Sequence, residues 1–120
     1  MLLTVSAYSQ SAEVATTTRA VNGKLISVTN ILGLSDCQTR SAVGKVKGVK
    51  VDGDVARFGL SANKETKDVE VRLDRIAADE RVVLFKDLIR KGNVLRIAGY
   101  ACDSGSVISA FSIDRVYQKK

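Results

Sequence analysis

Side chains that commonly do chemistry are scarce in this chain of 120 residues. The chain has no histidine, which removes the usual general base at neutral pH and the commonest transition-metal ligand. A Ser–His triad, a Cys–His nucleophile and a histidine-based zinc site are therefore excluded. The two cysteines are too few for a zinc site made of cysteines alone. We expect no metal site and no other cofactor.

Two pairs of acidic residues are the remaining candidates for catalysis. Asp52 and Asp54 flank a glycine, with Arg57 shortly after them, and Asp79 and Glu80 are adjacent. A nuclease would need clustered carboxylates for a metal and a nearby arginine, and the first pair gives only an outline of this. Both pairs fall where a hairpin turn and a helix start are expected, and acidic residues are common at both. The sequence therefore predicts a protein that is not an enzyme.

Cys37 and Cys102 can be interpreted in two ways. In an exported domain they would form one disulfide that closes a loop of about 65 residues, to which the loop-entropy argument assigns about 4 kcal/mol. In a reducing cytoplasm they would be two free thiols. Pairing also requires their Cα atoms to lie within about 7 Å.

The first residues bear on the same choice of compartment. Residues 1–12 resemble the second half of a secretory signal, and Ala7-Tyr8-Ser9 satisfies the small-x-small cleavage rule. No basic residue precedes the apolar run, and the run is short. We expect a periplasmic or secreted protein, with a cytoplasmic protein as the alternative. No run approaches eighteen apolar residues, so we expect no membrane span.

Alternation of apolar and polar residues predicts the strands that carry the polar side chains. We expect strands at residues 41–51, 57–62, 69–74, 93–102 and 106–117, and a further N-terminal strand at 20–29. The pattern of the first slips at Gly48, which indicates a bulge. Asp52-Gly53 is a strong hairpin signal, and Asn63–Lys67 is a polar turn. Residues 30–40 are loop-like in composition.

One helix is expected at Asp79–Lys91, between the third and fourth of these five strands. Asp79 would be its N-cap, and Gly92 would end it. Its apolar stripe, which we expect to face the core, consists of Val82, Leu84, Phe85, Leu88 and Ile89.

The last two strands carry a resemblance to a known fold. The segments Gly92–Ala101 (GNVLRIAGYA) and Ser106–Val116 (SVISAFSIDRV) resemble the closing hairpin of OB-fold domains. Over residues 41–117 the order of elements is similar to that of small exported bacterial OB-fold proteins of the periplasm. It also resembles the binding subunits of AB-type toxins, whose barrels often carry an intrachain disulfide.

The resemblance implies a mostly β fold. The expected architecture is a five-stranded Greek-key OB-fold-like barrel with one α-helix between strands three and four, plus the extra N-terminal strand. Residues 1–18 would be a leader or a disordered tail, and residues 19–120 would form one domain.

OB-folds commonly bind ligands on the exposed face of strands two and three and the adjoining loops. We therefore expect an exported binding or assembly module, with a protein or glycan partner and the possibility of a homo-oligomer. The candidate binding residues are the polar side chains of this face together with one exposed aromatic residue of the fourth strand: Arg57, Ser61, Asn63, Lys67, Glu70, Arg72 and Tyr100.

The alternative function is binding of single-stranded nucleic acid. The net charge is +6, and six basic residues lie on expected strands: Lys45, Lys47, Lys50, Arg57, Arg72 and Arg96. Bases also need exposed aromatic side chains on which to stack. Only Tyr100 and Tyr117 are suitable, because we expect Phe58 and Phe111 in the core and Phe85 in the helix stripe. This shortage favours the binding-module interpretation.

Overall fold

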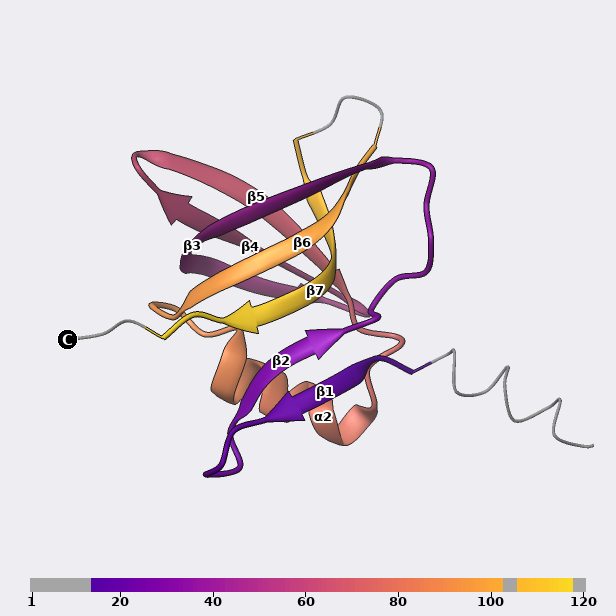
Figure 1. Ribbon diagram of the computed structural model, residues 1–120, viewed down its shortest axis with the longest axis vertical. Helices are drawn as coiled ribbons and strands as arrows, with labels where there is room; N and C mark the ends of the chain where they lie inside the picture. Colours follow the sequence, from indigo (N-terminus) through magenta and orange to yellow (C-terminus); the bar gives the residue numbers. More distant parts are fainter. Residues whose placement is uncertain (1–13, 103–105, 118–120) are drawn as a thin grey trace, which may run out of the picture.

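The structure, a computed structural model, describes residues 14–102 and 106–117. It is mostly β, with one sheet of seven strands and one helical segment (Figure 1). The elements follow in the order β1 (Thr16–Arg19), β2 (Leu25–Thr29), β3 (Gln38–Asp52), β4 (Val55–Ala62), β5 (Glu65–Arg72), α2 (Ala78–Val83), η1 (Leu84–Leu88), β6 (Val94–Ala101) and β7 (Ile108–Arg115). The mostly β class and the helix between β5 and β6 are confirmed. The strand count is not, because the described residues form seven strands.

The pairing of five strands in the sheet closes on itself, so that the last strand of the series pairs with the first. β3 pairs with β4 and β4 with β5, and β5 pairs in parallel with β7 over two residue pairs. β7 then pairs with β6, and β6 pairs with the first half of β3. The 15-residue β3 pairs with both β6 and β4. Its first half pairs with β6 along one edge, and its second half pairs with β4 along the other edge. The five strands from β3 to β7 thus pair in a continuous ring.

Two tight turns connect the central strands. Asp52 pairs with Val55 across a two-residue turn at Gly53, whose φ of +63° suits glycine, so the hairpin prediction is confirmed. The next turn is Asn63–Lys64, both at positive φ, and the expected polar turn is shorter than predicted because β5 begins at Glu65. The bulge predicted at Gly48 is also confirmed: the β3–β4 register shifts between Lys47 and Lys50, and Gly48 has φ +59°.

A second bulge was not predicted. On β6 and β7, Ala98 pairs with Ser112 but Gly99 pairs with Ala110, which leaves Phe111 as the extra residue. The bulge turns Phe111 out of the inward-facing series of β7. Phe111 is therefore half-buried and outside the core, which corrects the expectation for this residue. Its carbonyl accepts a hydrogen bond from the N–H of Ile31 at 3.2 Å.

The N-terminal ribbon differs from the expected single strand. β2 occupies only the end of the predicted range, and β1 pairs antiparallel with it across a turn at residues 20–24. Residues 16–18 of the expected leader or tail thus belong to β1. Residues 14 and 15 precede the strand, and residues 1–13 of that prediction lie outside the described residues. β2 also pairs with β7, which joins the ribbon to the ring.

The helical segment begins at Ala78, and its N-cap residue is Ala77, which makes no side-chain capping bond. The prediction of Asp79 as N-cap is therefore wrong; Asp79 instead lies in the first turn, where its charge favours the helix dipole. The segment continues as the π-helical turn η1 and ends at Leu88, three residues before the predicted end. Val82 is 71% exposed and does not belong to the buried stripe.

Apolar residues from every strand of the ring and from η1 form one core. Phe58 is buried in it, as predicted, together with Leu84 and Leu88 of η1 and with Ile89, which follows η1. The side chain of Asp87 accepts a hydrogen bond from the N–H of Leu25 at 3.0 Å, which ties η1 to β2. Within the described residues, no helix is long and apolar enough to cross a membrane.

Cys37 and Cys102 form a disulfide, with their Cα atoms 4.9 Å apart. The bond joins the loop before β3 to the end of β6. Of the two interpretations of the cysteines, the structure therefore has the disulfide and not the two free thiols.

Candidate functional site

The outer face of β3, β4 and β5 carries charged side chains in cross-strand rows. Lys47, Gly59 and Asp68 lie opposite one another on the three strands. The next row is Lys50, Arg57 and Glu70. Residues two apart on a strand share a face, so both rows lie on the same side of the sheet at β4 and β5.

The bulge at Gly48 places the two lysines together. Lys47 and Lys50 are three residues apart, and in a regular strand they would point to opposite faces. One extra residue in the bulge restores their common face. Val49, which lies between them, is partly buried against the core. The glycine thus has a direct effect on the composition of the outer face.

The two rows border a groove of about 620 Å³. Its basic side comes from β3 and β4, and its acidic side comes from Asp68 and Glu70 on β5. Two of the lining residues form an ion pair between adjacent strands, with Arg57 Nη2 3.6 Å from Glu70 Oε2. The other residues that line the groove are Gly48, Phe58, Gly59, Thr66, Val69 and Val107. Such a groove is complementary to an elongated ligand that has both positive and negative groups along its length.

Of the seven predicted binding residues, the structure brings Arg57 and Glu70 together in this groove. Ser61 lies beside it, opposite Lys45 and Thr66. Asn63 and Lys67 line a separate hollow of about 230 Å³. Arg72 lies at the end of β5 and pairs with Asp74, at 3.3 Å between Nη2 and Oδ2.

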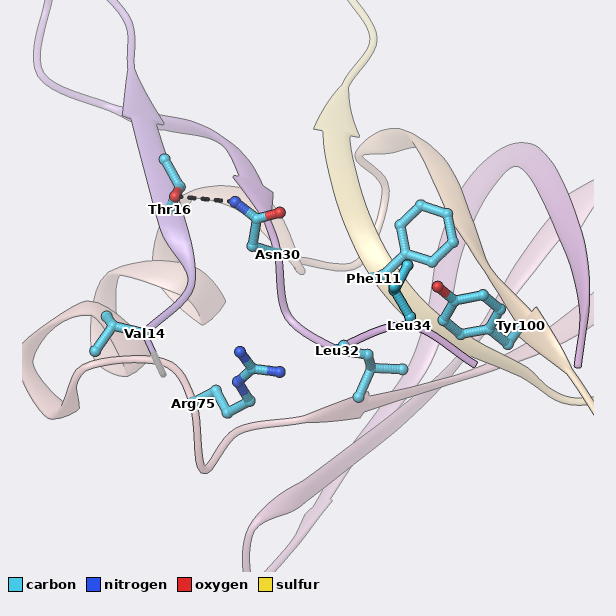
Figure 2. A pocket seen from close by; sticks show the side chains of 9 residues that line it. Val14, Thr16, Asn30, Leu32, Leu34, Arg75, Tyr100 and Phe111 are labelled. Atoms are coloured by element: carbon cyan, nitrogen blue, oxygen red, sulfur yellow. Dashed lines mark hydrogen bonds between the residues drawn. The ribbon is translucent and has the colours of Figure 1, made fainter. Parts of the chain in front are cut away.

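Tyr100, the seventh, lies on β6 and lines another pocket of about 380 Å³. Its ring packs against that of Phe111, with centroids 4.9 Å apart and planes inclined by 55°. Figure 2 shows these two rings at one end of the pocket and Thr16, Asn30 and Arg75 toward the other. The predicted site residues are thus divided among the groove, the hollow and this pocket.

Sequence reasoning missed Thr66, Gly59 and Asp68 as parts of the groove. The turn at Asn63–Lys64 would have located them, because it sets Ala62 opposite Glu65 and hence Gly59 opposite Asp68. No comparable signal marks the pocket around Tyr100, since its residues come from five separate segments of the chain.

The titratable residues of these surfaces form no metal-ligand group: among residues 14–102 and 106–117, no cluster of three or more His, Cys, Asp or Glu could hold a metal ion. No protein-family model matches the chain, and the search of curated proteins finds no match.

Proposed function

We propose that this protein is a non-enzymatic, exported binding module built on an OB-fold-like barrel. The ring of five paired strands from β3 to β7, with a helix between β5 and β6, supports the barrel assignment. The Cys37–Cys102 disulfide supports export, because such bonds persist in oxidising compartments and are rare in the cytoplasm.

The main support for a binding role is the arrangement of charged side chains along the groove on β3, β4 and β5, with basic residues on one side and acidic residues on the other. Three cationic side chains, Lys47 and Lys50 of β3 and Arg57 of β4, line the groove together with two carboxylates of β5, Asp68 and Glu70. An extended segment of a partner protein with acidic and basic residues would complement both sides. Such electrostatic complementarity contributes mainly to specificity and association rate.

Single-stranded nucleic acid is the second candidate, favoured by the lysines of β3. Two features of the groove weigh against it. The carboxylates of Asp68 and Glu70 would repel a phosphate backbone, and the one aromatic residue that lines the groove, Phe58, is only 3% exposed. Stacking of bases on exposed aromatic rings is therefore not supported in the groove.

A charge-reversal experiment tests the proposed function. The variant Lys47→Glu/Lys50→Glu reverses the basic side of the groove and leaves the Arg57–Glu70 pair in place. The matched control, Lys24→Glu/Lys86→Glu, makes the same change in net charge at exposed positions that do not line the groove. Tagged proteins would be isolated from the native source and their companions quantified by mass spectrometry.

We expect one protein partner to be lost from the groove variant and retained by the control. The same two variants would be titrated with a labelled oligothymidine at low and high salt. Equal recovery of the same proteins by both variants contradicts the proposal. Oligothymidine binding that weakens with salt and is lost only in the groove variant would replace it with the nucleic-acid function.

A further inference from the structure

The pocket around Tyr100 is separate from the groove, and the proposed function does not use it. It is bordered by the β1–β2 ribbon and Val14 before it, the loop after β2, Arg75 after β5, and the outer face of β6 and β7 (Figure 2). Its volume of about 380 Å³ lies at the small end of the range of about 300–1,000 Å³ that is typical of small-molecule sites.

Segments on two sides of this pocket are tethered to the rest of the fold. Ile31, at the start of the loop, is fully buried, and its N–H donates to the Phe111 carbonyl at 3.2 Å. The other end of the loop is fixed by the Cys37–Cys102 disulfide. On the opposite wall, the N–H of Ala15 donates to the Arg75 carbonyl at 2.8 Å. A pocket anchored in this way loses little conformational entropy on binding.

The lining is mainly apolar at one end and mixed at the other, where Val14 lies near Arg75 (Figure 2). The rings of Tyr100 and Phe111 lie at the apolar end with Leu34 beside them, and Leu32 lies between this end and Arg75 (Figure 2). At the other end, Asn30 Nδ2 donates to Thr16 Oγ1 at 3.3 Å, and both residues line the pocket (Figure 2). No acidic side chain lines the pocket.

We propose that this pocket binds a sugar, with one face of a pyranose ring on the aromatic pair and its hydroxyl groups toward Asn30 and Thr16. A purely apolar ligand would leave the polar side chains of the mixed end facing hydrocarbon, which is costly. A flat base would need a flat platform, whereas two rings inclined by 55° form a bent wall. A chair-shaped ring with apolar C–H groups and several hydroxyls matches both ends.

Gly33 offers a way to fill the pocket without disturbing the fold. It lines the pocket, its φ is not in the left-handed region, and a Cβ added there would have Arg75 Nη1, at 3.8 Å, as its nearest neighbour. The variant Gly33→Leu would therefore occupy the space that a ligand needs. Asp36→Leu is the matched control, because Asp36 is exposed in the same loop and lines neither this pocket nor the groove.

The test is saturation-transfer NMR with the methyl glycosides of glucose, galactose, mannose and N-acetylglucosamine, and with adenine as a flat competitor. A glycan array then distinguishes a free sugar from the end of a glycan chain. We expect at least one glycoside to bind, about tenfold or more weakly in Gly33→Leu and in Tyr100→Leu, and within about twofold of the parent in Asp36→Leu. Binding of adenine alone, binding of no glycoside, or unchanged affinity in both pocket variants would overturn the proposal.

Discussion

At the scale of single residues, Arg57 and Phe58 show how one strand serves two purposes. They are adjacent on β4, yet the Arg57 side chain is 69% exposed and Phe58 is buried in the core. Arg57 lies in the outer charged row, and Phe58 packs inside the ring. The proposed binding residue, Arg57, is thus one whose side chain contributes little to the fold.

This difference predicts the effects of truncating each residue. Arg57→Ala should lower the free energy of unfolding by less than about 1 kcal/mol, because exposed ion pairs contribute little. Phe58→Ala should lower it by about 3–5 kcal/mol through loss of burial and formation of a cavity. Urea denaturation of both variants measures the two values. Similar losses for the two variants would contradict the assignment of the two faces.

The fate of individual aromatic residues shows the limit of prediction from sequence at this scale. Phe58 was placed correctly in the core because β4 alternates regularly along its length. Phe111 was not, because a bulge on β7 shifts the alternation by one residue. The extra residue of that bulge is a phenylalanine, which gives no sign of a bulge in the sequence. The bulge on β3 has a glycine, Gly48, which did indicate it.

At the scale of elements, the junction between the helical segment and β6 depends on Asn93. Its Nδ2 donates to the carbonyls of Asp87 and Leu88, at 3.1 and 3.0 Å, and so satisfies the end of η1. The Asn93 carbonyl in turn accepts from the N–H of Val46 at 2.9 Å. One residue therefore connects the helix end with the middle of β3.

Asn93→Ala should lower the free energy of unfolding by about 1–2 kcal/mol, because two partly buried carbonyls lose their donor. Asn22→Ala is the control; its side chain accepts one long, exposed bond from the N–H of Lys24, and we expect a loss below about 0.5 kcal/mol. Thermal or urea denaturation compares the two. An equal effect would mean that the Asn93 side chain does not stabilise the helix end.

The elements themselves were largely predictable, and their ends were not. Strong alternation located β4, β5, β6 and β7 within a few residues. The helix start was misplaced because Asp79 has the residue type of an N-cap but is used in the first turn. The first three residues of β1 were assigned to a tail because the strand, TTTR, carries no apolar alternation and depends on pairing with β2.

At the scale of the whole molecule, the disulfide connects segments that are 65 residues apart. Removing it should lower the free energy of unfolding by about 2–4 kcal/mol, since the unfolded chain regains the entropy of an open loop. Urea denaturation of the parent with and without reductant, and of Cys37→Ser/Cys102→Ser, measures this effect. No difference between the oxidised and reduced protein would contradict a stabilising role.

The candidate site could be predicted only in part because it depends on the whole topology. The expectation that ligands bind on the exposed face of the second and third barrel strands, which are β4 and β5, led to Arg57 and Glu70. These two residues pair across a single hairpin. The pocket around Tyr100 requires the N-terminal ribbon, the disulfide-anchored loop and the β6–β7 face to meet. Such meetings between distant segments leave no local pattern in the sequence.

Site-specific photo-crosslinking in the native source tests the central claim most directly. A photoreactive residue would replace Thr66, which lines the groove, or Val21, which is fully exposed in the β1–β2 turn and serves as control. We predict a discrete adduct with one protein at Thr66, sensitive to protease and absent at Val21. A nuclease-sensitive adduct at Thr66, or the same products at both positions, would contradict the claim that this groove binds a protein segment.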